Sequence, residues 1–371
     1  MSFQVNPILV KELRSRMRGW RAFTILTIYL LVMALICYLI YYVISADSNL
    51  SGDGRPLSPV IGQALWIAIA YLSLIFVAFI TPALTATAIS SEYEKQTIDM
   101  LQTSLLTSHD ILFGKLISAM SYILMLLFAA IPIASLIFTF GGVTFGDFVL
   151  GVLIIFSTAI MLGMIGLFFS AWRKRTLQAI IFSYLTMLIL MTGVYALSLI
   201  STLLLAAIEP NTDKLFSDSS YYTLFFIFAI VRMAFALNPL SALASVFAST
   251  SYGNIGQFFG GISLTLGLFD EQYEIYPLWY YTLFLYALSA IVLHLLANRS
   301  IQPIRTWRLG KRSIILAIAV CVILFALGYM INTEWNVMTS FICNEVIPTN
   351  EHFHEDIARA SKVLWLDLTG F

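Results

Sequence analysis

The chain has 371 residues, of which 60% are hydrophobic and only 11% are charged. In a soluble domain about a quarter of all residues are charged. The composition therefore excludes a soluble globular fold and predicts an all-α polytopic membrane protein. The formal net charge is zero, which gives no reason to expect a nucleic-acid partner. The three cysteines are scattered along the chain, a pattern that predicts neither a disulfide framework nor a zinc site.

The first predicted element is an amphipathic helix over residues 1–19. Leu9, Leu13 and Met17 line its apolar side, and basic residues line the other. We expect this helix to lie along the inner membrane surface. A basic anchor and an elbow that transmits motion are both open interpretations, and the candidate functional residues are Lys11, Glu12, Arg14 and Arg18.

Seven hydrophobic segments follow that are long enough to span a membrane, since a span needs about 20 apolar residues. They are 20–45, 61–88, 113–140, 147–171, 177–208, 277–298 and 313–332. The sequence therefore predicts a six-span domain over 20–298, a basic inner linker over 299–312, a seventh span over 313–332 and an outer acidic tail over 333–371. Pro82 and Pro132 fall inside spans, where proline can kink a helix.

The orientation follows from the basic residues, which accumulate on the cytoplasmic side of membrane proteins. With the N-terminus inside, most of the Lys and Arg residues fall in inner segments, including Arg173, Lys174 and Arg175. We therefore expect a multi-pass protein of the inner (cytoplasmic) membrane, with its N-terminus inside and its C-terminus outside.

One long polar interval, residues 89–115, separates the second and third spans. Ile98, Leu101 and Leu105 recur at helical spacing, which predicts a short amphipathic helix. Acidic residues near its start and Lys115 at its end suit the helix dipole. Such a helix at the inner face could receive a soluble partner, and the candidate docking residues are Glu92, Glu94, Thr97, Leu101, Thr103 and Leu105.

Segment 221–249 is apolar enough to enter the membrane, but a single crossing would place the basic residues after the sixth span outside. We therefore expect a re-entrant segment that enters and leaves on the outer side. Asn238 and Pro239 supply its break, because proline disfavours helix at the residue before it. Arg232 facing lipid would cost about 2.5–3.5 kcal/mol, which a re-entrant path largely avoids.

No motif for chemistry appears in the chain. The sequence has no GxxxxGK[ST] phosphate loop, no HExxH and no GxSxG, so we predict no catalytic and no metal-ligating residue. The second to fifth spans hold no interior acid or base, which disfavours an ion-coupled transporter. The energy for any transport must then come from another subunit.

Two parts of the chain carry a resemblance to a known family. The stretch NPILVKELRSRMRG before the first span resembles the start of ABC-2 type exporter permeases, and the interval 89–115 resembles their inner loop. Gln96 stands where the family usually has glycine, Leu105 stands near its usual proline, and Asn238-Pro239-Leu240 resembles its outer re-entrant element. The resemblance covers about residues 1–310, and the loop positions that match are Ile89, Ser90, Glu92, Glu94, Thr97, Leu101, Thr103, Gly114 and Lys115.

The resemblance implies an ABC-2 exporter-like bundle of six spans with an elbow helix, a coupling-helix loop and a re-entrant segment. It also implies that this chain binds no cofactor and that ATP and magnesium bind to separate ATPase subunits, in two copies, which dock on the loop. A second permease chain, identical or related, would complete the path through the lipid bilayer. A non-transporting scaffold that docks an ATPase is the alternative, and an intramembrane enzyme is disfavoured by the missing catalytic residues. The cargo stays open, although the aromatic-rich spans favour an amphipathic or lipid-like molecule.

Overall fold

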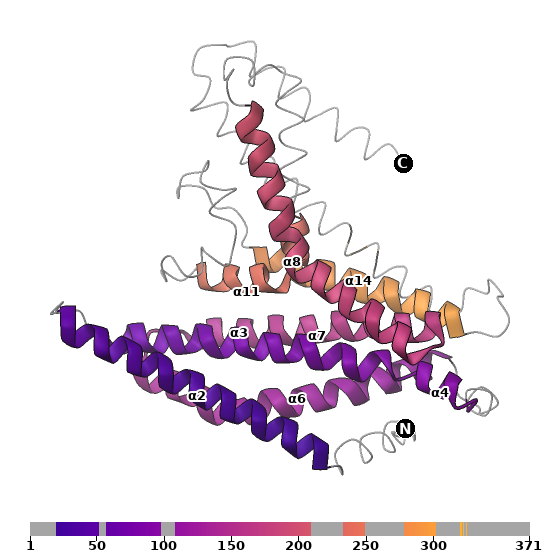
Figure 1. Ribbon diagram of the computed structural model, residues 1–371, viewed down its shortest axis with the longest axis horizontal. Coiled ribbons are helices and arrows are strands. Elements are labelled where there is room, and N and C mark those ends of the chain that lie inside the picture. Colours follow the sequence, from indigo (N-terminus) through magenta and orange to yellow (C-terminus); the bar gives the residue numbers. More distant parts are fainter. Residues whose placement is uncertain are drawn as a thin grey trace. The chain divides into compact units, whose positions relative to one another are not determined.

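A computed structural model describes residues 20–51, 57–97, 108–208, 233–248 and 278–301, together with Val320, Val322 and Leu324. Within these ranges the regular structure is entirely helical, which confirms the predicted all-α class (Figure 1). The helices are α2 (Trp20–Ser51), α3 (Leu57–Ala86), α4 (Ser90–Glu94), α6 (Ser108–Phe140), α7 (Phe145–Arg173), α8 (Thr176–Ile208), α11 (Pro239–Ala248) and α14 (Leu278–Ile301).

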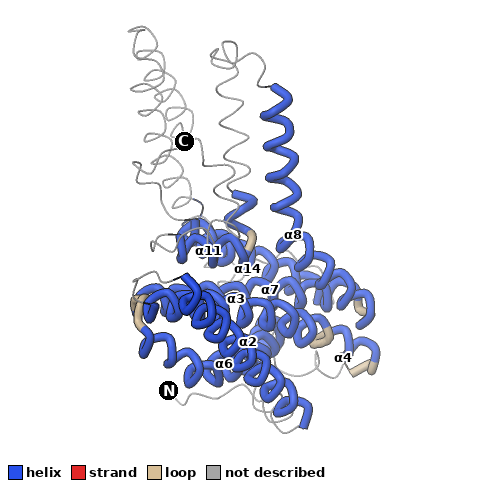
Figure 2. Tube along the Cα trace, turned by 60° about the vertical axis from the view of Figure 1, so that its left-hand side comes forward, coloured by secondary structure: helices blue, strands red, loops and turns tan. Residues whose placement is uncertain are grey.

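Six stretches of helix in the described part of the chain are long and apolar enough to cross a membrane. They correspond to the first six predicted spans: Phe23–Ala46, Pro59–Glu94, Ser108–Phe140, Phe145–Arg173, Thr176–Gly193 and Leu278–Ile301. The predicted seventh span, 313–332, lies almost wholly outside the described residues, as do the elbow helix and the acidic tail. Connections between the spans are short where the structure describes them: residues 141–144 join α6 to α7, and Lys174 and Arg175 join α7 to α8 (Figure 2).

The helices α3 and α7 are the centre of the packing. Helix α7 contacts α3, α14, α8, α6 and α11, and α3 also contacts α2 and α6. Small residues permit the close approach of α3 and α7, because a Cβ atom on Gly166 would lie 2.0 Å from Thr85 Oγ1. The α3–α7 pair is therefore the central packing unit of the described helices.

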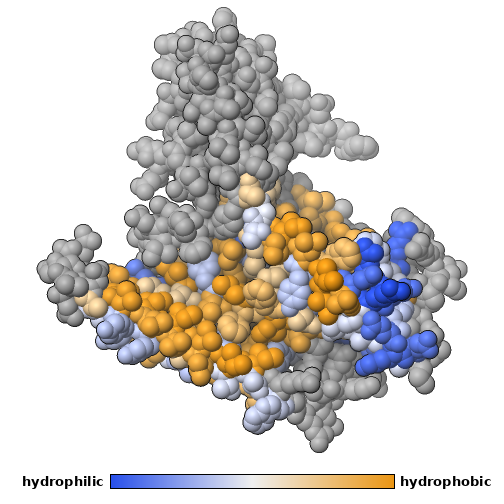
Figure 3. Space-filling model, in the orientation of Figure 1, coloured by the Kyte–Doolittle hydropathy of each residue, from blue (hydrophilic) through white to orange (hydrophobic). Residues whose placement is uncertain are grey.

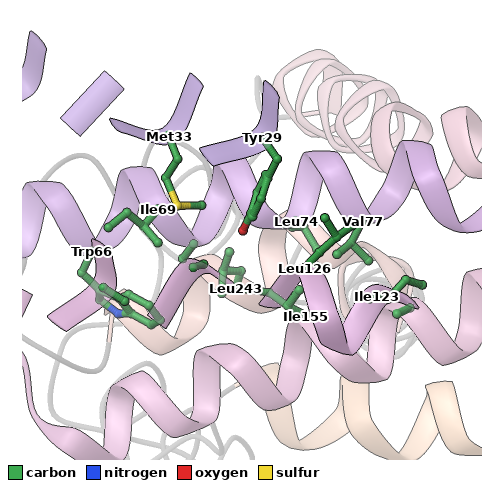
Figure 4. Close-up of a cluster of buried hydrophobic side chains, with 14 of the residues drawn as sticks. Tyr29, Met33, Trp66, Ile69, Leu74, Val77, Ile123, Leu126, Ile155 and Leu243 are labelled. Carbon is green, nitrogen blue, oxygen red and sulfur yellow. The ribbon is translucent and has the colours of Figure 1, made fainter. Parts of the chain in front are cut away.

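The largest buried cluster joins α2, α3, α6, α7 and α11. Trp66 packs against Phe148 with ring centroids 4.9 Å apart, and the hydroxyl of Tyr29 on α2 lies 3.0 Å from Ser73 Oγ on α3. The labelled members of the cluster come from helices far apart in the sequence: Tyr29, Met33, Trp66, Ile69, Leu74, Val77, Ile123, Leu126, Ile155 and Leu243 (Figure 4).

Where Figure 3 colours the described residues, the surface of the bundle is mostly apolar, and hydrophilic side chains gather at the end where α4 lies. Exposed apolar side chains such as Phe79, Phe128 and Leu188 belong to this surface. A soluble protein would not expose so many large apolar residues together. The distribution is that of a multi-pass membrane protein with one polar end at α4.

Candidate functional site

The polar end of the bundle is built around α4, a helix of 5 residues that follows α3 after a short turn. Ile89, at its N-cap position, has no side chain that can accept a hydrogen bond from the first N–H groups of the helix. The hydroxyl oxygen of Ser170 on α7 takes this role and accepts from the N–H groups of Ile89 at 2.9 Å and Ser90 at 2.8 Å. Helix α4 therefore depends on α7 for its cap.

The second attachment of α4 is an ion pair to α6. Lys115 is only 2% exposed, and its ammonium donates to Glu92 Oε1 at 2.7 Å and to the carbonyl of Ala88 at 2.7 Å. Burying an ammonium is costly unless it is paired and hydrogen-bonded, so Glu92 compensates Lys115. The pair fixes α4 to the beginning of α6.

The third attachment joins α4 to α8. Glu94 Oε1 accepts from the N–H of Thr176 at 2.7 Å, and Glu94 Oε2 accepts from the Thr176 hydroxyl at 2.7 Å. Thr176 is the first residue of α8, where backbone N–H groups have no partner within the helix and a negative charge is favourable. The carboxylate of Glu94 thus caps α8 from a neighbouring helix.

Two residues beside α4 adopt the left-handed backbone conformation. Gln96 has φ = 56°, at the turn that ends α4, and Lys174 has φ = 55°, at the C-cap of α7. The Lys174 ammonium lies 5.1 Å from the centroid of the Tyr93 ring, within the range of a cation–π interaction. Lys95, Gln96 and Thr97 are exposed, so the chain leaves the site through an open polar surface.

A pair of histidines joins the beginning of α6 to α14 at the same end. His109 Nδ1 lies 3.0 Å from His294 Nε2, and His109 Nε2 lies 2.9 Å from Asn298 Nδ2. The sequence gave no sign that His294 pairs with His109. Among the described residues, no three His, Cys, Asp or Glu side chains gather where they could hold a metal ion.

The predicted break at Asn238 and Pro239 is present. Residues 233–237 are helical, Asn238 interrupts them and Pro239 begins α11. Asn238 is fully buried; its Oδ1 accepts from the N–H of Leu240 at 2.8 Å, and its Nδ2 donates to the carbonyl of Met191 on α8 at 2.9 Å. Arg232, the third residue proposed for this segment, lies outside the described residues.

Comparison with known protein families identifies the family to which the chain belongs. The profile of the family described as "ABC-2 family transporter protein" matches residues 6–334. The chain belongs to the ABC-2 transporter family. No curated protein matches it.

Membership of the ABC-2 family makes the chain a membrane-embedded transport subunit. Of the docking residues predicted for such a permease, Glu92, Glu94 and Thr97 are described and lie together at α4. The others lie outside the described residues: Leu101, Thr103 and Leu105 of the loop, and Lys11, Glu12, Arg14 and Arg18 of the elbow. The structure therefore groups the first half of the loop motif and leaves the amphipathic helix predicted around Ile98 as an expectation.

Sequence reasoning missed the partners of the loop residues in this ABC-2 permease. Ser170 and Thr176 follow the loop by many residues and carry no motif, so only the fold brings them to α4. Lys115 was recognised as part of the motif, but its pairing with Glu92 was not predicted. The available signal was a lysine at the start of an apolar span, which requires an acidic or carbonyl partner when buried.

Proposed function

We propose that this chain is the permease subunit of an ATP-driven exporter and that a separate ATPase, in two copies, docks on the surface formed by α4 and the rest of the loop 89–115. The observation that carries the proposal is the exposed turn Lys95–Gln96–Thr97, which leaves α4 while α4 itself is bound to α6, α7 and α8. A partner that pushes on this turn can reach three spans at once. ATP and magnesium belong on the ATPase, since this sequence has no phosphate loop.

In this proposal the N-terminus and α4 face the cytoplasm, where ATP is available, and a second permease chain, identical or related, completes the transport path. The distribution of Lys and Arg supports this orientation. The protein then sits in the inner membrane, with the α6–α7 connection on the outer side.

The cargo we propose is amphipathic or lipid-like. An apolar cavity of about 330 Å³ lies among α3, α6 and α7, near the lower end of the volumes of small-molecule sites. Its wall is apolar apart from Ser73 and the Trp66 indole, and includes Phe128, Phe148 and Phe156. A cavity of this character supports an apolar moiety on the cargo and disfavours a small hydrophilic ion.

The docking surface can be tested with the full-length chain and the phosphate-loop ATPase that copurifies with it. We expect Lys95→Glu combined with Thr97→Glu to weaken ATPase binding, measured by the fraction of ATPase retained on immobilised permease. Thr139→Glu combined with Gly146→Glu, at two exposed positions at the opposite end of the bundle, is the control. Equal retention for both double variants would count against docking at this turn.

The alternative function, a scaffold that docks an ATPase without transport, shares the docking surface but not the response to cargo. In proteoliposomes that contain the permease and the ATPase, an exporter increases ATP hydrolysis when its cargo is supplied. Candidate amphipathic molecules and lipids that bind during purification are the first to test. ATP hydrolysis that no copurified molecule changes would favour the scaffold.

A further inference from the structure

The two acidic residues of the loop motif bind with their carboxylates to other helices of the same chain. Glu92 Oε1 accepts from the buried Lys115 ammonium, and its Oε2 is buried. Both oxygens of Glu94 accept from Thr176. Each carboxylate is therefore engaged by another helix of the permease, although Glu94 lies at the exposed surface.

The attachments of α4 reach three different helices. Ser170 connects it to the end of α7, Lys115 to the beginning of α6, and Thr176 to the beginning of α8. A buried apolar cluster fills the space beside these contacts and includes Ile89, Leu112 on α6 and Leu167 on α7. Displacing α4 alone would break charged and capping hydrogen bonds and open this cluster, whereas displacing α4 with the three helix ends would preserve them.

We infer that Glu92, Glu94 and Ser170 are positioning residues that fix α4 to the ends of α6, α7 and α8, so that a displacement of α4 by the ATPase is passed to these spans. This inference rests on the proposed function, because it assumes that an ATPase acts on α4. It assigns the acidic residues to transmission of force within the permease and leaves contact with the ATPase to the exposed turn after α4. Coupling between two distant sites requires a set of contacts whose arrangement both sites can bias. In this inference the three attachments of α4 are those contacts, between the surface that the ATPase would bind and the ends of α6, α7 and α8.

Matched variants can separate transmission from docking. Ser170→Ala removes the cap of α4, and Ser118→Ala removes another fully buried serine hydroxyl, which has no hydrogen-bond partner among the described residues. Glu94→Gln weakens the carboxylate contact to Thr176, and Asp147→Asn weakens a contact of the same kind, in which Asp147 Oδ2 accepts from the Thr144 hydroxyl at 2.7 Å at the other end of the bundle. Each pair changes the same chemical group, and only Ser170 and Glu94 take part in an attachment of α4.

The experiment uses full-length permease in lipid nanodiscs with the copurified ATPase. Three quantities are measured: ATPase affinity, stimulation of ATP hydrolysis by the permease, and the ATP-dependent change of a spin label at Leu177→Cys. Leu177 lies in the first turn of α8 and is 70% exposed. Cys37, Cys321 and Cys343 are replaced by serine in all samples so that only the new thiol carries the label.

We expect Ser170→Ala and Glu94→Gln to keep the ATPase affinity of the wild type. We also expect them to lower the stimulation and the label response by about fivefold or more, the lower end of typical allosteric coupling. Ser118→Ala and Asp147→Asn should retain both responses. Thermal unfolding identifies the variants that fold. Glu92→Gln is a further variant to measure, because its amide oxygen can still accept a hydrogen bond from Lys115.

Two outcomes overturn the inference while leaving the proposed function intact. One is an unchanged label response in Ser170→Ala and Glu94→Gln. The other is a loss of ATPase affinity in Glu94→Gln with normal stimulation of the ATPase that remains bound, which would make Glu94 a docking residue. A wild-type chain that binds no phosphate-loop ATPase overturns the proposed function itself and the inference with it.

Discussion

Gln96 occupies a backbone conformation that usually requires glycine. Its φ of 56° places it in the left-handed region, which costs an L-residue roughly 1–2 kcal/mol. Gln96 stands where the motif that the loop resembles has glycine, the residue that adopts a left-handed φ at least cost. The sequence identified the departure from glycine, but only the backbone angle shows that this position is left-handed.

Substitutions at Gln96 should follow this backbone requirement. We expect Gln96→Gly to unfold at the same temperature as the wild type or higher, and Gln96→Val to be less stable than Gln96→Gly by about 1–2 kcal/mol, because a β-branched residue is poorly accommodated at positive φ. Thermal unfolding in detergent measures the difference. At the neighbouring Lys95, where φ is −81°, glycine should give no advantage over valine; the same order at both positions would show that the left-handed turn is not responsible.

Lys115 illustrates how a buried charge constrains its surroundings. Replacing it by methionine removes the donor to Glu92 and to the Ala88 carbonyl while keeping a similar apolar volume. We expect Lys115→Met to lower the free energy of unfolding by about 1.5–3 kcal/mol, the range for hydrogen bonds to charged groups. Chemical unfolding in detergent gives this value, with the exposed Lys95→Met as control. A loss no larger than that of the control would mean that the pair contributes no net stability.

At the scale of the helices, the length of each hydrophobic segment correctly predicted a membrane-spanning helix, but it predicted where that helix begins and ends less accurately. The third span was expected at 113–140, but α6 begins at Ser108, because its first turn is polar and lies at the α4 end of the bundle. The short helix α4 was not separated from the loop, since its position depends on contacts with Ser170, Lys115 and Thr176 from three other helices. Local pattern cannot supply such contacts, which arise only when the spans pack.

The break at Asn238 was predictable because Asn-Pro is a local signal. Its role in packing was not, since Met191 lies on a different helix. Asn238 is also the N-cap of α11, with Pro239 at the first helical position, where proline is favoured. The side on which segment 221–249 enters the membrane stays a prediction.

Replacing Asn238 by alanine should therefore destabilise the protein through two losses. The N–H of Leu240 loses its acceptor, and the half-buried carbonyl of Met191, which lies inside α8, loses the side-chain donor of Asn238. We expect Asn238→Ala to cost about 0.5–2 kcal/mol for the cap and about 0.5–1.5 kcal/mol for the hydrogen bond to Met191, measured by thermal unfolding. Pro239→Ala is the control, because it leaves both hydrogen bonds in place. A smaller effect for Asn238→Ala than for Pro239→Ala would contradict the capping role.

At the scale of the whole molecule, composition and the spacing of hydrophobic segments were sufficient to predict the all-α membrane class and the six spans. The loop motif was sufficient to predict the family. Composition and spacing were sufficient because lipid requires every span to satisfy its own backbone hydrogen bonds, so a long apolar segment has one available structure. The arrangement of the α4 attachments was beyond sequence reasoning, because Ser170 and Thr176 have no distinctive neighbours. The orientation in the membrane depends on the charge rule alone, and it requires a direct test.

Labelling of introduced cysteines tests the orientation at two matched positions. Phe145, at the start of α7, is 72% exposed, and Leu177, at the start of α8, is 70% exposed, so access differs between them only by the side of the membrane. In a background with Cys37, Cys321 and Cys343 replaced by serine, we expect an impermeant thiol reagent to label Phe145→Cys in intact cells. Leu177→Cys should react only after the membrane is opened, because it follows the basic turn Arg173–Arg175 that the charge rule places inside. The reverse pattern would invert the topology, place α4 outside and remove the basis for docking a cytoplasmic ATPase there.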